Sequence, residues 1–582
     1  MSTYIAPLRD MEFVIHELAD FAAVAALPGC EELNAELTRQ VLEEAGRFAS
    51  GVLDPLNRIG DAQGTKLVAG EVQTAEGFAE AYRKFVAGGW NGLSAPLEFG
   101  GQELPYLLAI PVAEMWNSAN MAFCLCPMLT SSAVEALTQH GSPELQRIYL
   151  EKLVSGEWTG TMNLTEPQAG SDLSAVRCRA VPQGDHHRLH GTKIFITWGE
   201  HGMAENIVHM VLARTPNAPE GVKGISLFLV PKVLPTGERN DVQCVSLEHK
   251  LGIHGSPTCV LAYGEKEGAI GYLIGEENRG LEYMFTMMNH ARLGVGVEGL
   301  GIAERAYQHA LSYAKERIQG HDHSGKERVP IIRHPDVRRM LLTMKGQIEA
   351  MRGLAYFTAS RLDIAKRHSD AKERERNQAL ADLLIPVVKG WCTENAVDIA
   401  SLALQVHGGM GYVEETGAAQ YYRDARITTI YEGTTGIQAN DLVGRKVLRD
   451  KGAAVAALMA EMERCVAQLS GDSELRLMHS RFSSGAVALQ DATNWLLQNS
   501  GSEAVLAGAV PYLKLFGIVA GGWQMARAAM AAKQRLVSDR EFLQAKIAAA
   551  EFYSAHVLTL APALQNSIVD SSVLEPEAQD VY

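Results

Sequence analysis

The chain has 582 residues, more than one ordinary hydrophobic core contains, so about two to four domains are expected. Hydrophobic residues make up 47% and charged residues 21% of the sequence, which is typical of a soluble globular protein and excludes a disordered one. The net charge of −15 disfavours nucleic acid or an anionic membrane as the main partner.

The N-terminal third is predicted to be helical. Residues 1–35 form an arm with a short helix near 11–21, and residues 36–158 form a helical domain. In its first helix, Leu37, Val41, Ala45 and Phe48 share one face. Pro55, Gly60 and Gly64 are expected to break this pattern, and a second amphipathic helix is expected at 76–85.

The middle of the chain is predicted to be a β domain over residues 159–275. Its apolar segments alternate with period two or are rich in β-branched residues, and Gly and Pro separate them. This spacing indicates a small antiparallel barrel or sandwich. The segments concerned are HRLHGTKIFITWG, NIVHMVLART, GISLFLVPKV and QCVSLEHKLG.

Residues 276–448 are predicted to form a bundle of four helices, near 281–318, 336–368, 373–407 and 434–448. In the first helix, Arg305, His309 and Glu316 are expected to face away from the apolar stripe, which consists of Leu300, Ala303, Tyr307, Ala310, Ala314 and Ile318. Residues 321–333 are expected to be a long connecting loop. No third ligand accompanies His321 and His323, so no metal site is expected there.

Residues 449–582 are predicted to form an additional helical domain, rich in Ala and helical until Pro576. This tail carries more acidic than basic residues, so it is not a nucleic-acid-binding arm. Its apolar run 504–532 raises the question of a membrane span. Pro511, Lys514 and Gly521 interrupt the run, and this favours a buried helix over membrane insertion.

The cysteine pattern bears on the compartment of the protein. The eight cysteines include no CxxC pair and no disulfide-framework spacing, and no signal peptide is recognised. Reduced thiols and a cytoplasmic location are therefore expected. Cys124 and Cys126 are expected to be packing residues rather than metal ligands.

The segment YEGT, residues 431–434, is the strongest candidate for chemistry. Glu432 stands in an apolar, β-branched context and is followed by Gly433, which permits positive φ and close approach by a ligand. A carboxylate in an apolar pocket has a raised pKa and is a stronger base toward a weakly acidic C–H bond. The alternative is an ordinary exposed Glu in a turn.

Four segments, in this order, resemble the acyl-CoA dehydrogenase family: MNLTEPQAGSD (162–172), LHGTKIFITWG (189–199), LQVHGGMGY (404–412) and YYRDARITTIYEGTTGIQ (421–438). The opening residues and the long tail resemble a longer bacterial branch of that family. The resemblance implies a mainly α fold with a central β domain: an N-terminal helical domain, a β-barrel and a four-helix bundle, here with the additional C-terminal helical domain.

The resemblance also implies FAD as the cofactor and assigns residues to it. The matching positions around the flavin ring are Leu164, Thr165 and Ser171, with Phe195 and Thr197 on the barrel side. The alternative for the latter two is plain strand alternation, with Phe195 inside and Ile196 outside. For the rest of the cofactor the matching positions are Arg317, Gln319, Gln405, Gly408, Gly409 and Thr434.

For the reaction, the resemblance implies that Glu432 removes the α-proton of an acyl-CoA while the β-hydrogen leaves as hydride to the flavin, giving a trans-2-enoyl-CoA. The other position at which relatives carry the base holds Ala291. Arg292 and Gly433, together with Ser171, are the expected substrate contacts. A helix-surface arginine is the alternative for Arg292.

The substrate and the partners are predicted from the same resemblance. Fatty acyl-CoAs of medium to long chain (β-oxidation) are favoured, and the thioether 3-methylmercaptopropionyl-CoA is the alternative. Met121, Phe123 and Met128 are candidates for the pocket wall. Electron-transferring flavoprotein is the expected acceptor, and an acyl-CoA oxidase or a non-catalytic flavoprotein is the competing class. A homodimer is expected, with the tail covering the surface that shorter relatives use to form tetramers.

Overall fold

The fold is that of a computed structural model, in which residues 3–537 and 539–571 are described. Its described residues divide into two compact units, and each is taken by itself. The sheet unit consists of residues 47–104 and 119–294. The helical unit consists of the residues up to 46, residues 105–118 and the residues from 295 onward.

The helices of the sheet unit pack around aromatic side chains. The ring of Phe123 in α6 (Tyr106–His140) lies 5.9 Å from that of Phe78 and 6.1 Å from that of Phe85, both in α5 (Phe78–Ala87). The prediction that Pro55 and Gly60 break the helix is wrong. Pro55 lies in the first turn of α4 (Asp54–Gln63), where its missing N–H is tolerated. A Cβ at Gly60 would come within 2.8 Å of the Phe78 ring.

Short elements complete the helical part of the sheet unit. They are the π-helical η1 (Ala49–Leu53), the strands β1 (Lys66–Val68) and β2 (Glu71–Gln73), the 3₁₀ turns η2 (Trp90–Gly92) and η3 (Leu97–Phe99), and the helix α7 (Pro143–Ser155).

The sheet of this unit has the strand order β3-β6-β7-β10-β5-β9-β8, with β4 beside β5. β3 and β6 pair in parallel, whereas the other pairs are antiparallel, so the expectation of a wholly antiparallel sheet is not met. β6 and β7 are buried along their whole length, which explains their continuous apolar sequences. The strands are β3 (Trp158–Asn163), β4 (Arg179–Gln183), β5 (His186–Thr197), β6 (Asn206–Ala213), β7 (Ser226–Pro231), β8 (Val242–Leu247), β9 (Thr258–Tyr263) and β10 (Ala269–Ile274).

Three long helices of the helical unit match the prediction: α8 (Gly280–Glu316, from Val295 on), α9 (Pro335–Arg367) and α10 (Ala371–His407). The short α12 (Thr435–Asn440), which continues as the π-helical η9 (Asp441–Leu448), matches the fourth predicted helix, whereas α11 (Ala418–Thr428) was not predicted. Together with the sheet, they confirm the predicted fold class, mainly helical with a central β domain and extra C-terminal helices.

The predicted orientation of α8 is wrong in part, because Arg305 and His309 are buried rather than facing away. The guanidinium of Arg305 lies 5.4 Å from the centre of the Tyr421 ring, and the His309 ring lies 4.7 Å from that of His407. A helix in the middle of a bundle is enclosed by neighbours, so the rule of one buried stripe, which holds for surface helices, does not apply to it.

The segment predicted as a connecting loop at 321–333 contains a two-stranded hairpin, β11 (Ile318–His321) with β12 (Arg328–Pro330). The Asp322 carboxylate accepts hydrogen bonds from the Ser324 hydroxyl and from the N–H of Lys326 and Glu327, so it closes the turn of the hairpin. Among the described residues, no group of three His, Cys, Asp or Glu side chains could hold a metal ion.

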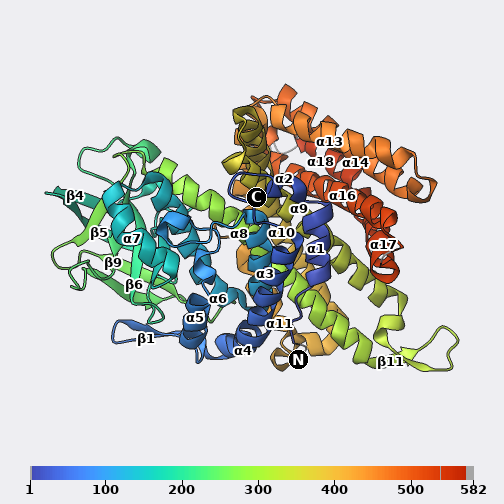
Figure 1. The fold of residues 1–582 in the computed structure, drawn as a ribbon, viewed down its shortest axis with the longest axis horizontal. Helices are drawn as coiled ribbons and strands as arrows, with labels where there is room; N and C mark the ends of the chain where they lie inside the picture. Colours follow the sequence, from blue (N-terminus) through green and yellow to red (C-terminus); the bar gives the residue numbers. More distant parts are fainter. Residues whose placement is uncertain (1–2, 538, 572–582) are drawn as a thin grey trace, which may run out of the picture. The chain divides into compact units, whose positions relative to one another are not determined.

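The tail is helical, and its central helix is buried, as predicted. Nearly every residue of α16 (Ala509–Gln534) from Leu515 to Ala529 is buried. A Cβ at Gly517 would lie 2.2 Å from the Trp391 ring of α10, so glycine allows α16 to approach closely. The orange-to-red tail helices lie together in Figure 1, and α16 and α17 contact α9. Pro576 lies outside the described residues. The other tail helices are α13 (Ala453–Ser470), α14 (Arg476–Gln498), α15 (Ala504–Ala507), α17 (Arg540–His556) and α18 (Ala561–Val569).

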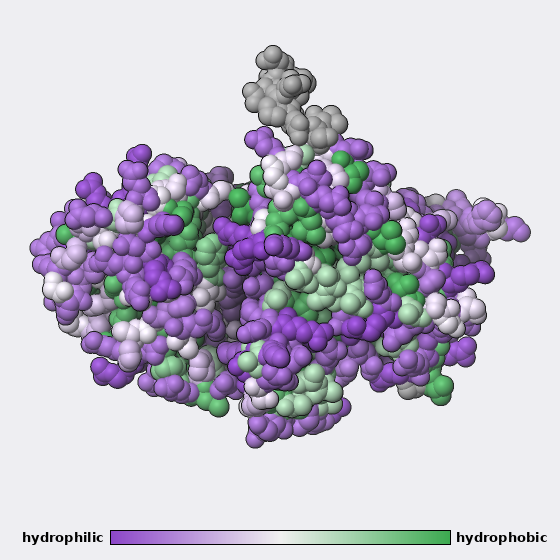
Figure 2. All heavy atoms as spheres, turned by 90° about the horizontal axis from the view of Figure 1, so that it is seen from above, coloured by the Kyte–Doolittle hydropathy of each residue, from purple (hydrophilic) through white to green (hydrophobic). Residues whose placement is uncertain are grey.

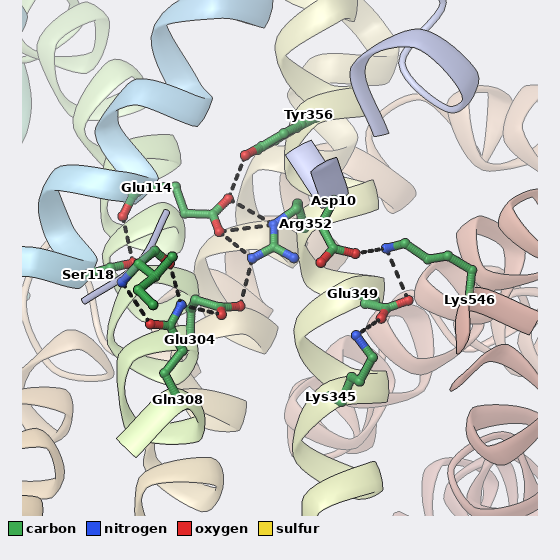
Figure 3. A network of polar contacts seen from close by, with 11 residues as sticks. Asp10, Glu114, Ser118, Glu304, Gln308, Lys345, Glu349, Arg352, Tyr356 and Lys546 are labelled. Atoms are coloured by element: carbon green, nitrogen blue, oxygen red, sulfur yellow. Dashed lines mark hydrogen bonds and ion pairs between the residues drawn. The ribbon is translucent and has the colours of Figure 1, made fainter. Parts of the chain in front are cut away.

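A buried cluster of charges holds the helical unit together (Figure 3). Arg352 of α9 donates from Nη2 to Glu114 of α6 at 2.6 Å and to Glu304 of α8 at 2.8 Å. The Tyr356 hydroxyl donates to Glu114 at 2.6 Å. Since Arg352 is 1% exposed, removing one partner would leave an uncompensated buried charge.

A neighbouring cluster ties the N-terminal arm and the tail helix α17 to α9 (Figure 3). Lys546 of α17 pairs with Asp10 of α1 (Leu8–Glu17) and, at 3.3 Å, with Glu349 of α9, which also pairs with Lys345 at 2.6 Å. Burial alone raises the pKa of the Asp10 carboxyl, but the cations around it, Lys546 foremost, outweigh burial and hold that pKa below its ordinary value. The N-terminal arm, which also contains α2 (Phe21–Ala25) and leads into α3 (Ala35–Phe48), is therefore fastened to the tail.

Within the part of the chain that the structure describes, two helical stretches, 106–140 and 540–569, could cross a membrane by length and composition alone. In the first, 78% of the apolar window is buried inside the protein, as in the core helix of a soluble protein. On the face shown in Figure 2, apolar residues occur in small groups among polar ones. None of the eight cysteines forms a disulfide and all are buried, and Cys124 and Cys126 lie in α6.

Candidate active site

The turn that carries Glu432 has a strained backbone. The β-branched residues before it lie at the end of α11, which closes at Thr428. Glu432 has φ of 54° and Gly433 has φ of 87°. A non-glycine residue in the left-handed region costs about 1–3 kcal/mol and persists where its surroundings determine it, which is common at functional sites.

Two buried side chains hold this turn in place. The Lys389 ammonium of α10 donates to the carbonyl of Gly433 at 2.6 Å, and the Gln438 amide of α12 donates to the carbonyl of Glu432 at 2.9 Å. A Cβ at Gly433 would come within 2.9 Å of the Gln438 amide, so the glycine predicted here is required. The Glu432 side chain is half-buried, which differs from the fully exposed alternative.

A second carboxyl, Glu298 of α8, contacts the turn through Tyr431. It is 1% exposed, and the Tyr431 hydroxyl donates to its Oε2. Burial raises the pKa of Glu298 to about 8, and the charge of Glu432 contributes to this rise. Glu298 was not among the residues predicted from the sequence. The signal was available, because a single acidic residue interrupts the apolar run VGVEGLG.

The remaining predicted residues of the helical unit lie at the ends of helices. Thr434 is the N-cap of α12, and its hydroxyl accepts the N–H of Ile437 at 3.3 Å. α10 ends at His407, and its C-cap Gly408 has φ of 61°; Gln405, Gly408 and Gly409 are exposed. Arg317 follows α8, and Gln319 lies in β11, where its carbonyl faces the His334 ring nitrogen at 2.7 Å.

In the sheet unit, the structure brings the TEP and FIT motifs together. The carbonyl of Thr165 accepts the N–H of Ile194 at 2.9 Å, and the carbonyl of Leu164 accepts the Lys193 ammonium at 2.9 Å. Lys193 also forms a buried ion pair with Glu166 at 2.8 Å. Glu166 in turn accepts two backbone N–H groups, from Arg177 and Cys178. The carboxylate of the TEP motif therefore fixes the loop that presents Thr165.

The plain alternation in β5, which was the alternative to a cofactor role for Phe195, is inverted in the structure. Phe195 is 58% exposed, whereas Ile196 is 1% exposed and belongs to the core of the sheet. The reason is an irregular register between Lys193 and Ile196, together with φ of 59° at Phe195. A large aromatic side chain held outward at a strained position is poorly explained by packing, and a planar ligand would cover it.

Trp198, in the segment LHGTKIFITWG, has a structural role. It is fully buried, its indole N–H donates to the carbonyl of Ala122 at 3.1 Å, and its ring stacks on Phe78 with 6.4 Å between centroids. Of the candidates for the pocket wall, Phe123 and Met121 are buried in the core and only Met128 is half-buried.

Two further candidates for ligand contact differ in exposure. Ser171 is exposed in the loop after the TEP motif, beside Asp172, which caps the following 3₁₀ turn. Arg292 is 3% exposed, which excludes the alternative of an ordinary surface arginine. Its guanidinium lies 6.0 Å from the centre of the Phe285 ring.

These residues fit the flavin that the resemblance implies. The Phe195 ring is exposed, and among the described residues the hydroxyls of Thr165 and Thr197 have no hydrogen-bond partner. Hydroxyls and backbone N–H groups are the donors that polar edges of a flavin ring accept. Gly408 and Gly409 leave open space around their backbone, so the phosphate or adenosine part could approach closely there.

Comparison with known proteins gives matches over nearly the whole chain. The protein-family model "Acyl-CoA dehydrogenase, N-terminal domain" matches residues 34–157. The family models for the middle domain and the C-terminal domain match residues 161–264 and 278–447. The model "Acetyl-CoA dehydrogenase C-terminal like" matches residues 458–574.

Individual relatives match at full length. 3-Methylmercaptopropionyl-CoA dehydrogenase of Ruegeria pomeroyi is 51% identical, with 98% of each chain covered. The broad-specificity linear acyl-CoA dehydrogenase FadE5 of Mycobacterium tuberculosis is 32% identical, with 99% of each chain covered. Among solved structures, an acyl-CoA dehydrogenase of Bacillus anthracis complexed with FAD has the same fold, with a TM-score of 0.75, 21% identity and coverage of 96% of this chain and 91% of that chain. The chain belongs to the acyl-CoA dehydrogenase family of FAD-dependent oxidoreductases and carries the additional C-terminal domain.

Proposed function

We propose that the chain oxidises 3-methylmercaptopropionyl-CoA to its α,β-unsaturated thioester. The observation that carries this proposal is the 51% identity over 98% of both chains with an enzyme named for that substrate. The relation supports the thioether better than the fatty acyl chains of medium to long length that the sequence analysis favoured. A linear acyl-CoA specificity is the second candidate, supported by the 32% identity with the broad-specificity relative.

The residues of the strained turn supply the proton chemistry. The Glu432 carboxylate takes a proton from the carbon next to the thioester carbonyl, and negative charge develops on the carbonyl oxygen. In this family a backbone N–H at the base position donates to that oxygen, and one such donor contributes about 3–4 kcal/mol to stabilising the transition state. Lys389 and Gln438 fix the turn beforehand through its carbonyls, so little reorganisation accompanies the reaction.

FAD, when bound, accepts the β-hydrogen with its electron pair as hydride. In the thioether this carbon is bonded to sulfur, whose lone pair stabilises the positive charge that develops as the hydride leaves. The product has the new double bond between the thioester carbonyl and the sulfur. On the protein side, Thr165, Phe195 and Thr197 are the residues that would hold the ring.

The assembly and the electron acceptor are parts of the same proposal. Exposed apolar side chains, with Met410 at 48% and Tyr412 at 91%, follow the exposed Gly408–Gly409 segment, which supports a partner subunit at this surface. We expect a homodimer, and a light-scattering mass near four chains would contradict it. Electron-transferring flavoprotein is the proposed acceptor, and slow reoxidation of the reduced enzyme by oxygen is the result expected for a dehydrogenase rather than an oxidase.

Substrate choice can be tested with a matched pair of ligands. Pentanoyl-CoA has the same chain length as 3-methylmercaptopropionyl-CoA and carries a methylene in place of sulfur. We expect kcat/KM for the thioether to exceed that for pentanoyl-CoA and octanoyl-CoA by about tenfold or more. This is the discrimination in kcat/KM that a binding pocket commonly achieves on one group of a substrate. Equal or higher kcat/KM for octanoyl-CoA would favour the linear acyl-CoA alternative.

A further inference from the structure

Glu298 is a buried carboxyl that the reaction described above does not use. It lies in α8 between Val297 and Gly299, in a part of the helix where a Cβ at Gly299 would come within 3.0 Å of the backbone of Cys392 in α10. This close packing of the two helices leaves the side chain 1% exposed. An ionised carboxylate at such a position needs a cation or several hydrogen bonds.

The contacts of Glu298 do not meet that requirement. Its Oε2 accepts the hydroxyl of Tyr431, and its Oε1 is buried without a hydrogen-bond partner among the described residues. It also forms no ion pair within that part of the chain. In a protonated Glu298, the proton would lie on Oε1, because Oε1 receives no hydrogen bond from any described residue and Oε2 accepts one from Tyr431.

The charged groups around Glu298 act in opposite directions. Glu432, next to Tyr431 in the turn, opposes a negative charge on Glu298, and Lys389 from α10 favours it. Burial raises the pKa of the Tyr431 hydroxyl, and the negative charge of Asp424 from α11 adds to this rise. The thiol of Cys392 stays neutral, because burial raises its pKa. Burial is the largest influence on Glu298. Together with the charge of Glu432 it raises the pKa to about 8, against the hydrogen bond from Tyr431 and the charge of Lys389, which both lower it.

We propose that Glu298 is a positioning residue of the active site: protonated at neutral pH, it anchors the Tyr431 hydroxyl and leaves Glu432 as the single carboxylate of the pair. This inference rests on the proposed role of Glu432 as the base. Two carboxyl groups that share a site do not both ionise readily, and the better solvated one keeps the charge. Here the better solvated one is Glu432, which is half-buried.

The rate of proton removal should therefore depend on the protonation of Glu298 and fall at alkaline pH. As pH rises through about 8, Glu298 ionises and places a second negative charge near the oxygen on which charge develops in the reaction. Proton removal from the substrate should then slow. The effect should depend on the carboxyl of Glu298 and not on the shape of its side chain.

The first test needs no turnover. Infrared difference spectra of the FAD-loaded enzyme, recorded from about pH 6 to about pH 10, should show a protonated carboxylic acid whose band disappears near pH 8. The band should be absent in Glu298→Gln, and in Glu432→Gln it should titrate at lower pH because the opposing charge is gone. A wild-type spectrum without this band overturns the proposal, whatever the substrate proves to be.

The second test uses the reductive reaction with any acyl-CoA that bleaches the wild-type flavin. In Glu298→Gln, the rate of bleaching should no longer fall above about pH 8, whatever its value at neutral pH. Tyr431→Phe, which removes the anchored hydroxyl, should lower the rate at every pH. An unchanged alkaline fall in Glu298→Gln overturns the proposal. Because the infrared band does not depend on substrate, failure of this inference is distinguishable from failure of the proposed reaction.

Discussion

Replacement of Glu298 by Gln should stabilise the protein increasingly as pH rises. The pKa of Glu298 rises from an ordinary 4.5 to about 8, so between these values the folded protein holds a proton that the unfolded chain has lost. The free energy of unfolding of the wild type therefore falls across this window. A shift of about 3.5 pH units, at 1.36 kcal/mol each, corresponds to at most about 5 kcal/mol.

The variant carries a penalty of its own that does not depend on pH. Its amide N–H groups would be buried where Oε1 now lacks a partner, which costs about 1–3 kcal/mol. Near pH 4.5 the variant should therefore be slightly less stable than the wild type, and above about pH 8 more stable by about 2–4 kcal/mol. The change of this difference with pH is the quantity to measure, because the fixed penalty cancels from it.

Guanidinium unfolding at constant excess FAD, on both proteins at a series of pH values, measures this difference. Glu316→Gln, at the exposed end of the same helix, is the matched control and should stay within about 0.5 kcal/mol of the wild type. A difference between Glu298→Gln and wild type that stays constant from about pH 4.5 to about pH 8 would refute the reasoning.

Three further predictions concern Lys546, Lys193 and Gly433, the first two with a matched comparison variant. Lys546→Met leaves the buried acids Asp10 and Glu349 without their cation and should lower the free energy of unfolding by about 3–5 kcal/mol. The control Arg9→Gln, in an exposed ion pair between the same two helical regions, should lower it by less than about 1 kcal/mol. Equal losses would show that the buried cluster does not fasten the tail. Lys193→Met should release FAD on gel filtration more readily than Lys193→Arg, and wild-type retention would contradict the role of the ion pair in holding the TEP loop. Gly433→Ala should lower the rate of flavin bleaching at least tenfold, roughly the effect of a misplaced base, with FAD still bound; an unchanged rate would show that the positive φ is not needed.

The positions of the long helices and of the main strands followed from the sequence, because local patterns determine them. The 3.6-residue period of α8, α9 and α10 and the period of two in the strands were sufficient to place them. The need for glycine at Gly433 was also predictable, since it follows from backbone geometry within the turn.

What the sequence could not show depends on contacts between distant segments. Phe195 points outward because β5 has an irregular register against β9, and a pattern of alternation cannot reveal that. Arg305 and His309 are buried because the bundle encloses α8 on every side. Glu298 is distinctive only through Tyr431, which lies far along the chain and meets it in the folded protein.

The central claim is that Glu432 removes the α-proton of 3-methylmercaptopropionyl-CoA. An anaerobic titration of the FAD-loaded wild type and Glu432→Gln with this thioester, followed by flavin bleaching, tests the claim most directly. We predict that the wild type bleaches and that Glu432→Gln binds the thioester without bleaching. Bleaching of both proteins would contradict the role of Glu432, and a wild type that stays yellow would contradict the proposed substrate.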